Sequence, residues 1–340
     1  MSEGFARRKV LGMLSASVPA QCCYALAKLG VPDLLAGGPR PVAELAAECG
    51  ADSRVLHRML RALAALGLFR HAGPDGYALT SAGELLRADV PGSLRQTAIM
   101  HGEAVFRSFA EIMHTVHTGE PAFEKVHGRP FYDYLGEHPD TGAVFAEAMG
   151  SEPVPAALAD YDLTGVGTLV DVGGGNGGLL AQVLPAHPGI RGVLLELPES
   201  VAAADTRLAA AGLADRVELV TGSFFDAVPT GGDVYVLARV LHNWTDEHAE
   251  TILRRVGSAM RPGARLLVVE KLLPEEPGSA AAAMVDLLML GMLEGYDRTE
   301  AEYTALLDKA GFEVVGAAAS TGSTVPTSGG AEGVLEAVPR

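Results

Sequence analysis

The spacing of apolar residues divides the chain into two parts. Between residues 5 and 160 they recur every three or four positions, as in VAELAAECG and DSRVLHRMLRALAALG, which predicts amphipathic helices. Asp52 is a suitable N-cap for the second of these helices, and Gly50 and Gly67 are suitable stops. A short strand, the turn GPDG and the strand YALT follow. Helices followed by such a hairpin predict a winged helix-turn-helix.

From residue 167 onward the pattern changes to short apolar runs: TLVDV, GVLLE, VELV, DVYVLA and ARLLVVE. Helical patterns at 176–186, 198–211 and 245–260 alternate with these runs. Apolar strands that alternate with helices predict an α/β domain, with a parallel sheet covered on both faces. The turn-rich tail at 318–339 predicts a long loop between two last strands, which form an antiparallel hairpin at the sheet edge.

Composition narrows the class of protein. A chain of 340 residues predicts two domains, and an apolar content of 48% is enough to fill their cores. The net charge of −16 argues against binding to a phosphate backbone and suits a cytoplasmic enzyme. The three cysteines are odd in number and lack zinc-site spacing, so we expect reduced thiols. 

The N-terminal stretch ARRKVLGMLSASVPA resembles the start of a signal peptide. Its apolar stretch is short, is interrupted by Gly12, and continues into a helical pattern. We therefore predict the first helix of the fold. No uncharged apolar run reaches membrane-spanning length, and we expect no contact with a membrane.

Ionisable residues gather where the predicted strands end. The first strand ends at Asp171, before GGGNGG; the second ends at Glu196, the fourth leads to His242, and the fifth ends at Glu270. Ligands of an open parallel sheet bind outside the carboxyl ends of its strands. Since each of these groups is costly to bury without a partner, their common edge predicts a ligand site.

The glycines indicate the kind of ligand. Gly173, Gly175 and Gly177 let the backbone turn tightly and a ligand approach it before a helix N-terminus. The stretch also fits G-x-G-x-x-G through Gly178, so a nicotinamide dinucleotide is an alternative. Asp171 precedes the glycines and the loop has no basic residue. A diphosphate gains nothing from that carboxylate, whereas S-adenosylmethionine carries a sulfonium and an ammonium, so we favour the methyl donor.

An ordered set of motifs extends this prediction: DVGGGNG, LELPES, GSFFDAVP, VLHNWTDE, LLVVEKLLPE and YDRTEAEY. In order and spacing the chain resembles the small-molecule O-methyltransferases of the caffeic-acid and antibiotic-pathway type. The resemblance implies a winged-helix dimerisation domain at 1–105, a helical linker and substrate-pocket region at 106–160, and a Rossmann-like class I methyltransferase domain at 161–340. It also implies seven strands with the last antiparallel, and a homodimer in which each N-terminal domain helps to wall the partner's site.

The resemblance further assigns residues to the donor. These are Asp171, Gly173, Gly175, Gly177, Glu196, Leu197, Ser223, Phe224, Ala238 and Arg239. Glu196, usually Asp in the family, would hold the ribose. Ser223 stands where the family usually has an acidic residue, Ala238 where plant members often have lysine, and Asn243 where Asp is usual. The loss of charge at Ser223 predicts a weaker contact with the donor.

His242 is the predicted general base. A phenol has a pKa of about 10, so a histidine that takes its proton as the oxygen attacks the methyl carbon assists the reaction. In-line alignment of oxygen, carbon and sulfur lowers the barrier further. Glu270 would orient the imidazole, as in the serine-protease triad, and the resemblance adds Asp297 as a second carboxylate. The alternatives are a hydrogen-bonded packing histidine beside Trp244, or a metal ligand; no second histidine or cysteine lies at ligand spacing, so we predict no metal.

The predicted acceptor is a small hydroxylated aromatic molecule, such as an aromatic polyketide of bacterial secondary metabolism. Its expected contacts are Phe145, Met149, Trp244, Asp286, Met289 and Met292. Two other functions stay open. One is a DNA-binding regulator, because Arg54, Arg58 and Arg61 share one helix face, although such a face is usually solvated and the chain is acidic. The other is non-methylating chemistry on the same fold, which the retained His242 disfavours.

Overall fold

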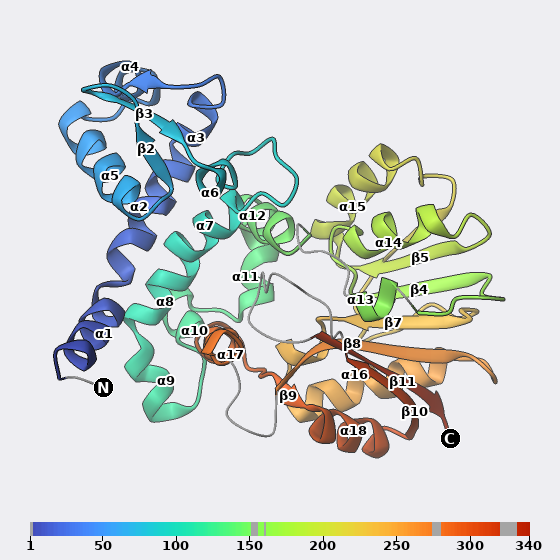
Figure 1. Ribbon diagram of the computed structural model, residues 1–340. Coiled ribbons are helices and arrows are strands. Elements are labelled where there is room, and N and C mark those ends of the chain that lie inside the picture. The colour runs from blue at the N-terminus through green and yellow to red at the C-terminus, as the bar shows by residue number, and fades with distance from the viewer. Residues whose placement is uncertain (1–2, 151–155, 160, 274–279, 320–331) are drawn as a thin grey trace. The chain divides into compact units, whose positions relative to one another are not determined.

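The change in hydrophobic pattern has a counterpart in the structure. The computed structural model describes residues 3–150, 156–159, 161–273, 280–319 and 332–340, and it divides into two units, Met1–Arg107 and Ser108–Arg340 (Figure 1). The helices from residue 108 to 159, expected as a separate linker, are part of the second unit. The reason is packing: the helix at 139–150 contacts the helix at 198–210, and the helices at 112–127 contact the helix at 280–292.

The first unit contains the predicted helices and hairpin. Its elements are α1 (Glu3–Ser15), α2 (Ser17–Lys28), α3 (Val31–Leu34), β1 (Arg40–Pro41), α4 (Val42–Cys49), α5 (Ser53–Ala65), β2 (Phe69–His71), β3 (Gly76–Leu79), α6 (Ser81–Glu84), α7 (Arg95–Met100) and the π-helix η1 (His101–Val105). Asp52 caps α5 by accepting a hydrogen bond from the Val55 N–H at 2.9 Å. Its apolar stripe of Leu56, Leu60 and Leu63 is buried against the three-stranded sheet β1-β3-β2.

The N-terminal helices differ from the prediction in one respect. Residues Gly4–Lys28 form a helical segment of 25 residues that meets the length and composition for crossing a bilayer. We expected no segment of that kind, and on these two criteria one is present. Only 11% of its most apolar window is buried within the chain.

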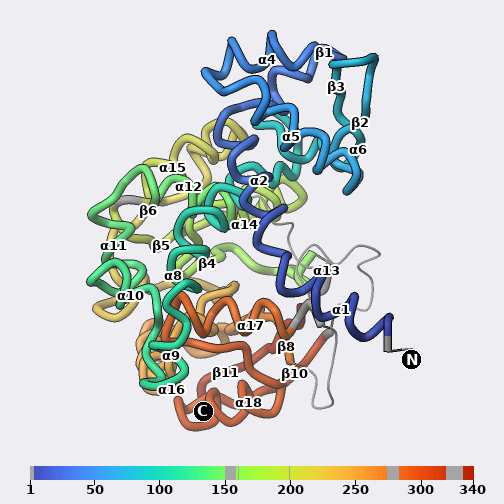
Figure 2. The backbone as a smooth tube through the Cα atoms, turned by 90° about the vertical axis from the view of Figure 1, so that its left-hand side faces the viewer, coloured from blue at the N-terminus to red at the C-terminus, as the bar shows by residue number. Residues whose placement is uncertain are grey.

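The second unit begins with a group of helices. They are α8 (Phe106–Ala110), which spans the boundary, α9 (Ile112–Thr118), α10 (Ala122–His127), α11 (Phe131–Glu137), α12 (Pro139–Gly150) and α13 (Ala156–Ala159). Helix α17 (Ala280–Met292), much later in the chain, packs beside α9 and α10 (Figure 2). Gly291 of α17 also allows a close approach to α8, because a Cβ there would lie 2.6 Å from the ring of Phe109.

The sheet of the second unit has the predicted class. Its strands are β4 (Thr168–Val172), β5 (Arg191–Glu196), β6 (Val217–Thr221), β7 (Val234–Ala238), β8 (Arg265–Leu273), β10 (Phe312–Ala319) and β11 (Glu332–Pro339), in the order β10-β11-β8-β7-β4-β5-β6. The pairs among β4 to β8 are parallel, and β11 is antiparallel to both β8 and β10. The predicted seven strands and antiparallel last strand are confirmed; the short β9 (Arg298–Thr299) pairs with the end of β8 in addition. The loop at 320–331 lies outside the described residues.

Helices cover both faces of this sheet (Figure 1). The helices after the strands are α14 (Gly178–Val183), η2 (Leu184–Ala186), α15 (Pro198–Ala210), η3 (Leu241–Asn243), α16 (Asp246–Ala259) and α18 (Glu300–Lys309). One core lies between the sheet and α16 and α18, and the other lies between the sheet and α14 and α15. Along β8, Leu266 and Val268 point to the first core, while Leu267 and Val269 point to the second. With both faces buried, the carboxyl edge of the parallel strands is where polar residues gather.

Candidate active site

The loop between β4 and α14 presents its backbone at that edge. Gly173, Gly175 and Gly177 have φ angles of 72°, 59° and 72°, in the left-handed region that favours glycine. At Gly173 the space is also tight, because a Cβ would lie 3.1 Å from the Phe224 ring. Gly175 faces open space and donates its N–H to Glu196 Oε2 at 2.8 Å. The loop therefore offers bare backbone, which a ligand can approach closely.

Asp171 lies directly beneath this loop, and its charge is uncompensated. The residue is 1% exposed, and neither carboxylate oxygen has a hydrogen-bond partner in the part of the chain that the structure describes. Burial, and then the charge of Glu196, raise the pKa of Asp171 to about 7. A buried carboxylate without a partner is costly, and a cationic ligand group would supply one. The chemistry of the loop thus fits the ammonium and sulfonium of the predicted donor.

Glu196, at the end of β5, connects this loop to the next strand. Its two oxygens accept hydrogen bonds from different backbone N–H groups, Leu197 at 2.7 Å and Gly175 at 2.8 Å. A further contact comes from Asn176, whose buried side-chain amide donates to the Ala146 carbonyl on α12 at 2.8 Å. Asn176 was not among the predicted site residues. It attaches the glycine loop to the helix that carries Phe145 and Met149.

The remaining predicted donor residues are placed differently. Ser223 Oγ accepts a hydrogen bond from the Phe225 N–H at 3.2 Å, so it stabilises its own turn. The ring of Phe224 lies against Gly173. Ala238, at the end of β7, packs on the core beneath α14. 

Arg239 has two features that its sequence position does not reveal. Its φ of 56° is the only positive value for a non-glycine residue in the described ranges. Its Nε donates to Glu332 Oε1 at 2.5 Å, which directs the guanidinium to β11. Asn243 closes this turn by donating its side-chain N–H to the Arg239 carbonyl at 3.1 Å. The turn leads from the end of β7 to His242.

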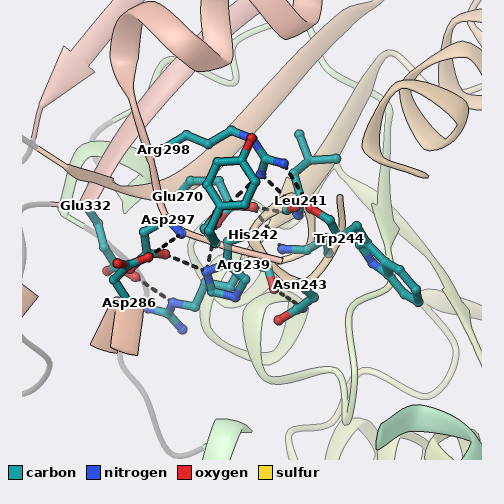
Figure 3. A network of polar contacts seen from close by, with 12 residues as sticks. Arg239, Leu241, His242, Asn243, Trp244, Glu270, Asp286, Asp297, Arg298 and Glu332 are labelled. Carbon is teal, nitrogen blue, oxygen red and sulfur yellow. Dashed lines mark hydrogen bonds and ion pairs between the residues drawn. The ribbon is translucent and has the colours of Figure 1, made fainter. Parts of the chain in front are cut away.

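His242 lies in η3 between two carboxylates (Figure 3). Its Nδ1 is 3.2 Å from Asp297 Oδ1 and 3.3 Å from Glu270 Oε2. Both carboxylates therefore face the same ring nitrogen, and no described residue forms a hydrogen bond to Nε2. Burial acts to lower the pKa of His242, but the charges of Glu270 and Asp297 outweigh it and raise the pKa above 6.5. The arrangement gives a histidine with one nitrogen fixed and the other available to a ligand.

Glu270 is itself held by the turn that carries His242. Its Oε1 accepts hydrogen bonds from the Val240 N–H at 3.0 Å and the Leu241 N–H at 2.7 Å, and the side chain is 1% exposed. Burial raises the pKa of Glu270, whereas the His242 charge and the Leu241 N–H act to lower it. One oxygen is thus used for the backbone and the other faces the imidazole.

Arg298, which was not among the predicted site residues, holds the backbone on both sides of His242. It is buried, and its guanidinium donates to the carbonyls of Leu241 at 3.1 Å and Trp244 at 2.9 Å, which flank His242 (Figure 3). The same group forms an ion pair with Asp246 Oδ1 at 2.8 Å. Its position in the sequence EGYDRT, directly after the predicted carboxylate Asp297, is the feature by which the sequence could have indicated Arg298. Asp286 completes the network by accepting the Asp297 N–H at 3.3 Å.

A group of aromatic rings packs around Trp244, two residues after His242. Trp244 stacks on Tyr132 of α11, with ring centroids 5.6 Å apart and an interplanar angle of 20°. Phe224 and Phe225 pack perpendicular to Trp244, with ring centroids 6.0 Å and 4.8 Å from that of the indole. The ring centroids of Phe145 and Tyr132 are 6.1 Å apart. Tyr132 was not predicted, although the aromatic-rich stretch FYDYL marks its helix.

The three predicted methionines differ in burial. Met149, near the end of α12, is 39% exposed, and Met289 is partly buried. Met292, at the end of α17, is buried, which is typical of a core residue and not of a residue in a pocket wall. Among the described residues, no group of three His, Cys, Asp or Glu side chains is arranged to hold a metal ion.

Comparison with known proteins agrees with both parts of the fold. Residues 109–313 match the O-methyltransferase domain family, and residues 11–89 match the O-methyltransferase dimerisation domain. The phenazine O-methyltransferase PhzM of Lysobacter antibioticus is 41% identical over 306 residues, which cover 89% of this chain and 90% of that protein.

Solved structures extend the similarity to nearly the whole chain. The crystal structure of LaPhzM has a TM-score of 0.93 at 38% identity and covers 98% of this chain and 99% of its own. An O-methyltransferase from neocarzinostatin biosynthesis, solved with S-adenosylmethionine and 2-hydroxy-5-methyl naphthoic acid, has a TM-score of 0.79 at 36% identity, covering 94% and 96% of the two chains. The fold, the glycine loop and these matches lead to one conclusion: this protein belongs to the O-methyltransferase family.

Proposed function

We propose that this enzyme transfers a methyl group from S-adenosylmethionine to a phenolic or enolic hydroxyl of a small aromatic metabolite, with His242 as general base. One observation carries the assignment of the base: Glu270 and Asp297 both face His242 Nδ1, and Nε2 has no described partner. An acceptor hydroxyl at Nε2 would lose its proton to the ring as it attacks. The two carboxylates would stabilise the imidazolium that forms.

The donor supplies a methyl group already activated on a positively charged sulfur. The chain's own part is to hold that molecule. Asp171 provides the buried negative charge for its ammonium, and the bare backbone at Gly175 provides close approach. Glu196 is the residue for the ribose hydroxyls, at the end of the strand beside Asp171.

An aromatic acceptor is supported by the rings around the base. Trp244, two residues after His242, makes perpendicular contacts with Phe224 and Phe225, and flat apolar surfaces of this kind bind planar ligands. The relative solved with a naphthoic acid is similar over 94% of this chain. A hydroxyl needs a base more than an amine does, since a neutral amine attacks through its lone pair. His242 and its two carboxylates therefore favour oxygen as the acceptor atom.

Calorimetric titration with S-adenosylhomocysteine tests the function directly, with NAD as a parallel control. We expect micromolar binding of the homocysteine adduct and no binding of NAD, because the loop offers carboxylates and no cation for a diphosphate. Labelled donor would then be used to screen phenolic acceptors. Binding of NAD alone would make the loop a dinucleotide site and overturn the proposal.

We also propose that the enzyme is a cytoplasmic homodimer whose N-terminal helices are covered by a second copy. Met13 is 66% exposed and Leu14 is 75% exposed on α1, and Val18 on α2 is exposed as well. The match to the dimerisation domain begins at residue 11, so these three residues lie at its start. A second copy of the chain would bury this apolar surface without a membrane.

Leu14→Asp is expected to convert a dimer into a monomer, because it places a charge on the exposed apolar face. Molar mass from light scattering during size-exclusion chromatography measures the change. Val55→Asp is the matched control, since Val55 is an exposed apolar residue on α5 of the same unit. A wild-type monomer that sediments with lipid vesicles would refute the dimer and indicate a membrane contact.

The regulator alternative receives less support. Arg54, Arg58 and Arg61 are exposed on α5, as a DNA-reading face requires. Three arginines on a chain of net charge −16 give a weak field for a phosphate backbone. A gel-shift assay at physiological salt is the direct check.

A further inference from the structure

Tyr132 lies among residues from both halves of the proposed site. It is the second residue of α11, and its ring stacks on Trp244, two residues after the proposed base. The ring of Phe145, from the helix expected to contact the acceptor, is perpendicular to it, with the two ring centroids 6.1 Å apart. The Tyr132 ring therefore contacts both α12 and the turn that carries His242.

The charges around Tyr132 keep its hydroxyl protonated. Burial raises the pKa of Tyr132, and the negative charges of Glu196 and Glu270 raise it further. These two carboxylates are the proposed ribose ligand and the partner of the base, so the hydroxyl is under the electrostatic influence of both parts of the site. No described residue forms a hydrogen bond to it. A neutral hydroxyl in this place is a donor that still lacks an acceptor.

The methyl donor has a group that needs such a hydroxyl. Its amino-acid end carries a carboxylate as well as an ammonium, and the ionisable side chains at this edge are mainly acidic: Asp171, Glu196, Glu270 and Asp297. An ionised carboxylate cannot donate a hydrogen bond to another one. We propose that Tyr132 is a donor-binding residue, whose hydroxyl donates to the carboxylate of S-adenosylmethionine and whose ring separates the donor from the acceptor. This inference rests on the proposed function.

Two ligands that differ only in the amino-acid end provide the test. S-adenosylhomocysteine has the carboxylate, and 5′-methylthioadenosine has the same nucleoside and a thioether without it. Tyr132→Phe removes the hydroxyl and keeps the ring. We expect about a tenfold weaker Kd for S-adenosylhomocysteine, or about 1.4 kcal/mol, and an unchanged Kd for 5′-methylthioadenosine, both measured by calorimetry.

Tyr134→Phe is the matched control, because Tyr134 lies on the same helix and stacks instead on His138 at 3.7 Å. It should change neither Kd. An unchanged Kd for S-adenosylhomocysteine in Tyr132→Phe would refute the inference, and equal weakening of both ligands would move the contact from the carboxylate to the nucleoside and also refute it. If the wild-type enzyme fails to bind S-adenosylhomocysteine, the proposed function itself fails.

The stack on Trp244 has an independent readout, because Trp244 is the only tryptophan of the chain. Removing the ring in Tyr132→Ala should expose the indole and shift its fluorescence emission to longer wavelength. Tyr132→Phe should leave the emission near that of the wild type. An unshifted spectrum in Tyr132→Ala would show that the ring does not cover Trp244, which would contradict its role as the separating wall.

Discussion

Replacing His242 with alanine is expected to lower turnover by about 10²–10⁴-fold, the usual contribution of a general base. Binding of S-adenosylhomocysteine should stay close to wild type, because the glycine loop and Asp171 are on β4 and its following turn. Single-turnover kinetics with labelled donor measure the first effect and calorimetry the second. His117→Ala, at an exposed position on α9, is the control and should keep full activity.

The pH profile separates base chemistry from positioning. His242 must be neutral to accept a proton, and its pKa lies above 6.5, so activity should fall as the pH drops through that raised value. Glu270→Gln removes one of the two charges that raise the pKa. The acid limb of its profile should therefore move to lower pH, with a smaller loss of rate than in His242→Ala. Wild-type activity in His242→Ala would mean that alignment alone drives the reaction.

Asp171→Asn is expected to stabilise the ligand-free enzyme while weakening the binding of S-adenosylhomocysteine by more than tenfold. The pKa of Asp171 rises from 3.8 to about 7 on folding, so the folded state holds this proton more tightly than the unfolded chain. The contribution of Asp171 to stability is thus most favourable below pH 4 and becomes less favourable as the pH rises to about 7. At 1.36 kcal/mol per pKa unit, the full penalty at neutral pH is about 4 kcal/mol.

Asparagine removes the charge but stays a buried polar group, so the expected gain at pH 8 is smaller, about 1–3 kcal/mol. Urea unfolding of the ligand-free protein at pH 4 and pH 8 measures it. The difference in unfolding free energy between the variant and the wild type should therefore be larger at pH 8 than at pH 4. Asp215→Asn, at an exposed site, should show no such pH-dependent difference from the wild type. Equal slopes in Asp171→Asn and the wild type would show that Asp171 already has a charge partner.

Local patterns were enough for much of the fold. Runs such as TLVDV and ARLLVVE alternate between two buried faces once they pair, so their composition alone indicates a covered parallel sheet. Gly173, Gly175 and Gly177 needed positive φ angles, which only glycine adopts readily, and the structure has them there. The positions of Asp171, Glu196 and Glu270 followed from the rule that strand ends share one edge. The glycine conformations and the apolar runs depend on near neighbours in the chain, and the common edge follows from the general topology of parallel sheets.

Contacts between distant segments depended on the tertiary structure. The sequence placed His242 near two carboxylates, but only packing of η3 against β8 and the start of β9 brought Glu270 and Asp297 to the same ring nitrogen. Arg298 acts through carbonyl oxygens more than fifty residues away, and a carbonyl leaves no mark in a sequence. Tyr132 meets Trp244 across a separation of more than a hundred residues. Periodicity reports which face of an element is buried; which partner it is buried against is settled only when the whole chain packs.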